Sequence, residues 1–303
     1  MVYLKSIEIY KGELEKINKN DKELCGYMQN TIGYTYKLLC EENTQQKETD
    51  IQKENKWYHK LWKNIVRYCI KGEGITTTKD TENSIEDWKR QAETYLKKSV
   101  ENNPKGRYHQ NLGAYYATIR DYDKALEQYK LAFNAEKRDD KIYNLIGSVL
   151  LYRAEMKLGI SERFQKGIVL SEITLDKIDE EERLNIQNDI KQAYEWLNLA
   201  IKQVNPIINA YYNYSKACIY DSLFLGGGSQ KMSEADKYLN TVEIIWNMND
   251  SQKPKGYLYT RRNYWEANKE YDKALEINQV IMNDDNSGDA RAAERVYDSK
   301  KRN

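Results

Sequence analysis

The sequence has few of the residues that make turns, and it has no long apolar run. Among 303 residues there are 3 prolines and 15 glycines. A β-sandwich or barrel needs a turn about every 8–12 residues, so this scarcity argues against those folds and favours helices. No segment approaches the about 20 consecutive apolar residues that cross a bilayer.

Histidine and cysteine are also scarce. The four cysteines, Cys25, Cys40, Cys69 and Cys218, contain no CxxC pair. In a chain of this size, such scattered thiols are typical of reduced, buried core residues. Charges interrupt the first residues too early for a secretory apolar region, so we expect a cytoplasmic protein.

The sequence offers no convergent set of catalytic or metal-binding groups. His59 and His109 are its 2 histidines, and neither has a second His or a Cys at metal-ligand spacing. We expect His109 to be a groove or surface residue. The segment Gly226–Lys231 lacks the second Gly–Lys step and the strand of a phosphate-binding loop, so it is interpreted as a loop between helices. We therefore expect no enzyme, no metal and no cofactor.

The charges of the chain balance. There are 48 Lys and Arg against 47 Asp and Glu, for a net charge of +1. This balance gives no general attraction to nucleic acid or to a membrane surface. The aromatic residues, which include 26 Tyr and 6 Trp, are numerous enough for a long core and argue against a disordered chain.

Two short motifs recur in the same order and at nearly the same separation. The hexapeptide at 122–127, Tyr-Asp-Lys-Ala-Leu-Glu, is repeated unchanged at 271–276. Upstream of each copy, Pro-Lys-Gly occurs at 104–106 and again at 254–256. These matches indicate two copies of one helix–turn–helix unit.

The first copy has small and large residues at fixed places: Leu112, Gly113, Tyr116, Ala125, Tyr129 and Ala132. This pattern resembles the tetratricopeptide repeat, whose consensus is 34 residues long. The resemblance implies an all-α fold, a right-handed solenoid of paired helices. It also implies that Gly113 and Ala125 lie where the two helices of a pair cross.

Other segments fit the same unit with interruptions. Ala92, Leu96 and Ser99 have the spacing of a second helix, opened by a capping signal at 84–87 and preceded by a first helix at 57–70. A loop at 71–83 would join the two. The following list gives the remaining predicted pairs: a first helix at 141–150 with a second helix at 193–200, then 211–218 with 235–242, and a last unit at 258–281.

Two of these units carry additional features. The unit that begins at Lys141 has an insertion at 159–178, after which Asp179 and Glu182 form a predicted capping box. In the next unit Ser233 would cap the second helix. The last unit has Arg261 and Arg262 in place of the usual Leu-Gly pair, which predicts looser packing or the end of the array.

The chain is therefore predicted to have three parts. Residues 1–55 form a helical pair or cap, in which the polar run 41–48 is a helix end or linker. Residues 56–285 form the repeat solenoid, and residues 286–303 form a capping helix and tail. The three prolines, Pro104, Pro206 and Pro254, all fall between units, where a missing N–H costs least.

The resemblance also predicts a concave groove lined by the first helix of each unit. Rings with a polar tip, together with amides, suit an extended peptide, so we expect a scaffold or adaptor that binds a peptide or protein partner. The predicted groove residues are Arg107, Gln110, Thr118, Asn144, Ser148, Tyr152, Tyr212, Lys216, Tyr220, Tyr259 and Asn263.

Two other functions stay open at this stage. A regulatory receptor would close on a small signalling ligand or peptide and would become more compact when that ligand binds. An array that binds RNA or DNA would stack bases on its tyrosines and would need its basic residues on one face. Those basic residues are Lys97, Lys98, Lys105, Arg107, Arg261 and Arg262.

Overall fold

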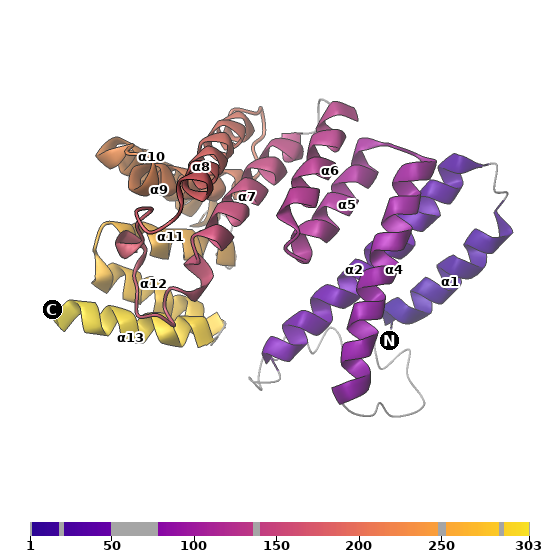
Figure 1. The fold of residues 1–303 in the computed structure, drawn as a ribbon, viewed down its shortest axis with the longest axis horizontal. Coiled ribbons are helices and arrows are strands. Elements are labelled where there is room, and N and C mark those ends of the chain that lie inside the picture. Colours follow the sequence, from indigo (N-terminus) through magenta and orange to yellow (C-terminus); the bar gives the residue numbers. More distant parts are fainter. Residues whose placement is uncertain are drawn as a thin grey trace. The chain divides into compact units, whose positions relative to one another are not determined.

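The computed structural model describes residues 2–17, 21–49, 78–135, 140–247, 253–284 and 288–302. These residues form helices and no strand, so the all-α prediction is confirmed for them (Figure 1). The helices are α1 (Val2–Lys16), α2 (Lys22–Thr49), α4 (Thr78–Asn102), α5 (Gly106–Thr118), α6 (Tyr122–Ala135), α7 (Asp140–Lys157), α8 (Glu180–Ile201), α9 (Ile208–Phe224), α10 (Gly228–Asn247), α11 (Lys255–Ala267), α12 (Tyr271–Asp284) and α13 (Gly288–Arg302).

The chain forms two compact units, Met1–Lys137 and Arg138–Asn303. In the first, α1 packs against α2, α2 against α4, and α5 pairs with α6. In the second, α7 pairs with α8, α9 with α10 and α11 with α12, while α13 covers α12. The three-part division at residues 55 and 285 and the right-handed solenoid stay predictions.

Glycine allows the two helices of a pair to approach closely. A Cβ at Gly33 would lie 2.7 Å from Leu96 Cγ, and one at Gly113 would lie 2.7 Å from the Tyr129 ring. At Gly147 a Cβ would overlap the side chain of Leu197. Gly113, which was predicted to lie at a helix crossing, therefore lies where α5 and α6 approach closely. Gly33 in α2 and Gly147 in α7 allow the same close approach of the second helix.

The second helices share a buried pattern of residues at intervals of four and then three. Each of these residues packs against the first helix of its pair and is almost fully inaccessible to solvent. The residues are Ala92, Leu96 and Ser99 in α4; Ala125, Tyr129 and Ala132 in α6; Ala193, Leu197 and Ala200 in α8; Ala235, Leu239 and Val242 in α10; and Ala274, Asn278 and Ile281 in α12.

Among the described residues, α4 packs along α2. The first helix that was proposed at 57–70 lies outside the described residues. In addition, α4 begins at Thr78, so Ser84 lies inside the helix and the capping signal at 84–87 is wrong. Residues 78–83, which were predicted as part of the 71–83 loop, therefore belong to α4.

Helix boundaries in the second unit follow the sequence more closely. Asp179 caps α8, with its side chain accepting a hydrogen bond from the Glu182 amide at 2.9 Å, as predicted. The predicted cap at Ser233 is wrong, because α10 begins at Gly228. The interhelix loop is shorter than expected, since Gly228 and Ser229 already belong to the helix. The predicted terminal helix is confirmed as α13.

The insertion at 159–178 is a folded part of the second unit. It contains two short 3-10 helices, η1 (Ile160–Glu162) and η2 (Leu170–Glu172). Phe164 and Val169 are buried in a core cluster with residues of α12 and α13. Phe164 meets the Tyr297 ring edge-on, with 5.7 Å between the centroids. The insertion thus ties the middle of this unit to its C-terminal helices.

The first helices of the second unit form a layer of their own. α7 contacts α9, and α9 contacts α11. We call α7, α9 and α11 the first-helix layer. In the first unit α2 contacts α5 in the same manner. This arrangement brings the predicted groove residues of successive helices next to one another.

Three of the cysteines confirm the prediction of buried thiols. Cys25, Cys40 and Cys218 are buried. Burial raises the pKa of the Cys40 thiol to about 11, which keeps it protonated and unreactive at neutral pH. Cys69 lies outside the described residues.

Candidate functional site

The predicted groove residues of the second unit lie on the first-helix layer, but they differ in exposure. Tyr152 on α7 is 40% exposed, and Tyr212, Lys216 and Tyr259 are partly buried. The others are buried and make hydrogen bonds inside the chain. These are Asn144, Ser148, Tyr220 and Asn263.

Glu155 is the centre of a polar cluster between α7 and α9. Its Oε1 lies 3.0 Å from Lys216 Nζ and accepts a hydrogen bond from the Tyr220 hydroxyl at 2.5 Å. Lys216 Nζ also lies 5.2 Å from the centroid of the Tyr152 ring. We call Tyr152, Glu155, Lys216 and Tyr220 the Glu155 cluster. Glu155 was not predicted, although it follows Tyr152 by three residues and shares its helix face.

Burial and the Glu155 carboxylate shift the pKa values of the neighbouring lysine and tyrosines. Burial lowers the pKa of Lys216, but the adjacent Glu155 carboxylate outweighs burial, and the net pKa is raised. Burial and the same carboxylate raise the pKa of Tyr220 well above its usual value. Burial, with Tyr152 nearby, raises the pKa of Tyr212 to about 12. At neutral pH Lys216 is therefore an ammonium, and the phenols of Tyr212 and Tyr220 stay protonated.

Asn144 and Asn213 join α7 to α9 on the same layer. The Asn213 amide donates to Asn144 Oδ1 at 3.0 Å, and both residues are buried. Ser148 is also buried, and its hydroxyl donates to the Leu145 carbonyl at 3.0 Å. The asparagine pair joins α7 to α9 and thereby positions Tyr152 and Lys216, whereas the Ser148 hydrogen bond lies within α7.

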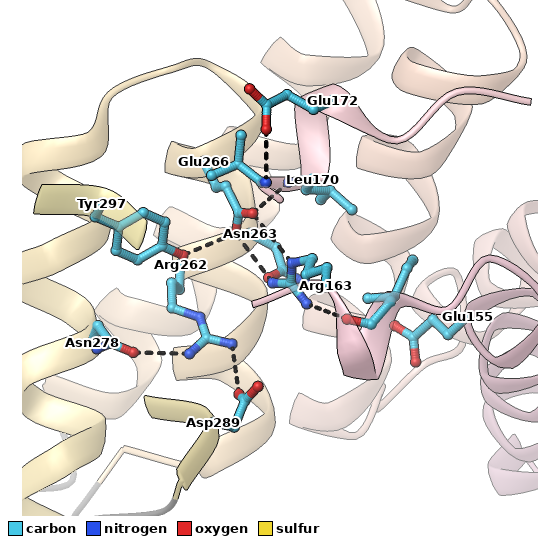
Figure 2. A network of polar contacts seen from close by, with 12 residues as sticks. Glu155, Arg163, Leu170, Glu172, Arg262, Asn263, Glu266, Asn278, Asp289 and Tyr297 are labelled. Atoms are coloured by element: carbon cyan, nitrogen blue, oxygen red, sulfur yellow. Dashed lines mark hydrogen bonds and ion pairs between the residues drawn. The ribbon is translucent and has the colours of Figure 1, made fainter. Parts of the chain in front are cut away.

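On α11 the layer is already occupied by the insertion (Figure 2). Arg163 donates to Asn263 Oδ1 at 2.8 Å and forms a buried ion pair with Glu266, with 3.1 Å between Nη2 and Oε2. Glu266 also accepts from the Leu170 amide and, at 2.9 Å, from the Tyr297 hydroxyl. Asn263, a predicted groove residue, is thus bound by a segment of its own chain.

Burial and charge explain why this contact is stable. Glu266 is 0% exposed, so its carboxylate needs the several donors that surround it. Burial lowers the pKa of Arg163, but the Glu266 carboxylate outweighs burial and raises the net pKa above the usual value. No periodic signal in the sequence marks this pair, because its partners lie far apart along the chain.

Arg262 stands where the repeat pattern has the glycine at which two helices cross, and it places a buried cation there. Its Nη1 donates to Asn278 Oδ1 at 2.9 Å, and its Nη2 lies 3.5 Å from Asp289 Oδ2 (Figure 2). The guanidinium lies over the rings of Phe164 and Tyr259, at 4.8 Å and 5.1 Å from their centroids. The substitution that was predicted to loosen the last pair therefore supplies it with polar contacts.

In the first unit, the predicted groove residues lie on α5. Arg107 is exposed and Gln110 is partly buried. Thr118 is exposed, and its Oγ1 lies 3.0 Å from both Glu41 Oε1 on α2 and the Ala114 carbonyl of its own helix. The structure thus brings Thr118 against a carboxylate that was not predicted.

The histidine prediction needs a correction. His109 is 8% exposed and lies 2.9 Å from the side chain of Gln128, so it belongs to the α5–α6 interface and not to a groove or surface. His59 lies outside the described residues. Within the described ranges no group of three or more His, Cys, Asp or Glu side chains could hold a metal ion.

Comparison with known proteins assigns no family. No protein-family model matches the chain, and no curated protein matches it. Among the described helices, none is long and apolar enough to span a bilayer.

Proposed function

We propose that this chain is a non-catalytic, cytoplasmic protein-interaction module of the tetratricopeptide type, a scaffold or adaptor. Its first-helix layer would bind an extended polypeptide segment of a partner. The residues that touch the partner would be Tyr152, Tyr212, Lys216 and Tyr259, which keep part of their surface accessible. The buried residues beside them would hold these side chains in place.

The contact between the insertion and α11 is the observation that carries the proposal. An irregular segment of this chain lies on the first-helix layer, with a backbone amide bound to Glu266 and a side chain bound to Asn263. The layer therefore has the hydrogen-bonding groups that an irregular polypeptide needs. Between α7 and α9 the Glu155 cluster offers comparable groups next to an exposed tyrosine ring.

The charges of the layer support a peptide over a nucleic acid. Lys216 is paired with Glu155, and Arg163 with Glu266. Arg261, one of the basic residues that a nucleic-acid face would need, is buried and lies 2.6 Å from Asp236. Arg262 is buried as well. Cations held in this way are not free to neutralise phosphates.

Selection from a random displayed-peptide library, followed by titration of one selected peptide, would test the proposal. We expect the full chain to select extended peptides, and we expect the variant Tyr152→Ala/Tyr212→Ala to bind at least about tenfold more weakly at the first-helix layer of the second unit, since buried aromatic contacts commonly contribute more than 1.4 kcal/mol. The matched control is Leu199→Ala/Ile244→Ala, which removes exposed apolar side chains from the second helices α8 and α10.

Two results would contradict the proposal. The first is that no peptide is selected. The second is that the control variant loses affinity while the tyrosine variant keeps it, since the second helices would then form the binding surface.

A further inference from the structure

The two units share a sequence pattern on their first helices that the hexapeptide repeat does not include. α2 contains Asn30, Ile32, Gly33 and Glu41, and α7 contains Asn144, Ile146, Gly147 and Glu155 at identical spacing. The isoleucine is 0% exposed in both, and both glycines lie against a leucine of the second helix. The matching positions therefore have the same packing role.

Both asparagines of this pattern make the same hydrogen bond to the next first helix. The Asn111 amide of α5 donates to Asn30 Oδ1 at 3.0 Å. The Asn213 amide of α9 donates to Asn144 Oδ1, also at 3.0 Å. Each unit thus joins its neighbouring first helices through one asparagine pair.

Both glutamates of the pattern lie within hydrogen-bond distance of a hydroxyl on the next first helix. Thr118 Oγ1 on α5 lies 3.0 Å from Glu41 Oε1 and equally far from the Ala114 carbonyl of its own helix, and the Tyr220 phenol on α9 donates to Glu155 Oε1 at 2.5 Å. In each case the hydroxyl residue follows the donating asparagine of its helix by seven positions. Two turns of helix therefore carry the same pair of contacts in both units.

A lysine and an exposed tyrosine complete each cluster. Lys37 Nζ lies 2.8 Å from Glu41 Oε1 and 5.2 Å from the centroid of Tyr34, which is 38% exposed. We call Tyr34, Lys37, Glu41 and Thr118 the Glu41 cluster. In the Glu155 cluster the lysine comes from α9, whereas Lys37 comes from α2 itself. The same groups meet in both units although the lysine has a different origin in each.

The chemistry of these clusters matches the peptide group. In each cluster the lysine and the hydroxyl both bind Oε1 of the glutamate, and a carboxylate can accept further hydrogen bonds. An ammonium group has three donors, of which the glutamate uses one. A Lys–Glu pair has no net charge. Beside a flat ring, its ammonium can donate to a peptide carbonyl and its carboxylate can accept from a peptide N–H. A ligand charge of either sign would meet one like charge.

We propose that each unit carries one binding face for the same extended polypeptide segment, centred on Glu41 in the first unit and on Glu155 in the second. The chain would then bind two copies of that segment, either from two partners or from one partner with a repeated motif. This inference rests on the proposed function, because it assumes that the first helices bind polypeptide. It adds a second peptide-binding face and a stoichiometry of two peptide segments per chain.

Calorimetric titration of the full chain with the synthetic peptide selected above would test the inference. We expect two peptides per chain for the wild type. Glu41→Gln and Glu155→Gln should each leave one face at the original affinity and weaken the other at least about tenfold, and the double variant should be weakened at both faces. The matched controls are Glu127→Gln and Glu195→Gln, exposed carboxylates of the second helices α6 and α8.

Variants of the exposed rings, Tyr34→Ala and Tyr152→Ala, provide a second measurement that is less sensitive to folding. Each should also remove one of the two binding events, with an unchanged circular dichroism spectrum. One peptide per chain, with only one glutamate and one tyrosine affecting it, would overturn the two-face inference and leave the proposed function standing. No binding by the wild type would overturn both.

Discussion

Arg163, in the insertion, and Glu266, on α11, form a buried ion pair with 3.1 Å between Nη2 and Oε2. The pair links residues that are 103 positions apart in the sequence. Glu266 also accepts from Tyr297 on α13, so the contact holds three parts of the second unit together. It accounts for the ordered path of an insertion that the repeat pattern does not explain.

Replacing Arg163 by methionine should therefore destabilise the second unit strongly. The variant would leave the Glu266 carboxylate buried without its cation, and breaking one partner of such a pair costs about 3–5 kcal/mol. The free energy of urea unfolding would measure the loss. The control is Lys166→Met, in the same insertion, whose ion pair with Glu162 is exposed and should contribute less than about 1 kcal/mol. Equal effects of the two variants would contradict this account.

The crossing glycines give a prediction with a matched control in the first unit. A Cβ at Gly33 would meet the Leu96 backbone nitrogen at 2.9 Å, whereas one at Gly12 would meet nothing within 4 Å. Gly33→Ala should therefore destabilise the unit by about 1–3 kcal/mol through overpacking. Gly12→Ala should stabilise it by up to about 1 kcal/mol, because alanine favours helix. Urea unfolding would compare them, and a stabilising Gly33→Ala would show that α2 and α4 can separate without cost.

These contacts show which features the sequence could predict. The residues at intervals of four and three, such as Ala125, Tyr129 and Ala132, have helical periodicity, and the structure places them in second helices. The packing of α4 along α2 was not predicted, because the chain between these helices is far longer than the usual repeat loop. Gly33 stands at the glycine position of the repeat pattern. It lies so far along the sequence from Ala92 that the pairing of α2 with α4 could not be recognised.

The candidate site was predicted only in part, for a physical reason. Residues such as Tyr152 and Lys216 could be placed on first helices from the repeat alone, because periodicity fixes the helix face. Their partner Glu155 required knowledge of which helices are neighbours. Contacts such as that of Arg163 with Asn263 join an aperiodic segment to a distant helix, and no local pattern encodes them.

The pH dependence of stability provides a prediction for Glu243. A hydrogen bond from Lys253 at 2.7 Å, opposed by burial, holds the pKa of this carboxyl below its ordinary value of 4.5. A lowered pKa contributes stability that is present above pH 4.5 and is lost as the pH falls through the folded-state value. Glu243→Gln should thus be less stable than the wild type at about pH 6 and should approach it at about pH 3.

Urea midpoints at both pH values would measure this convergence. Glu276→Gln, an exposed carboxyl of α12, is the control and should shift the midpoint little at either pH. A deficit of Glu243→Gln that is the same at both pH values would mean that the substitution acts through packing and not through the Glu243 charge.

The asparagine pairs predict equal coupling in the two units. A double-mutant cycle of Asn144→Ala and Asn213→Ala should give a coupling free energy of about 1 kcal/mol, the usual net value of one hydrogen bond. The cycle of Asn30→Ala and Asn111→Ala should give a similar value, because both pairs have the same 3.0 Å geometry. Asn209→Ala, at an exposed position of α9, should show no coupling to Asn144→Ala. Coupling in one unit alone would mean that the shared asparagine pattern does not have the same structural role in both, and the equivalence of the two binding faces would lose its main support.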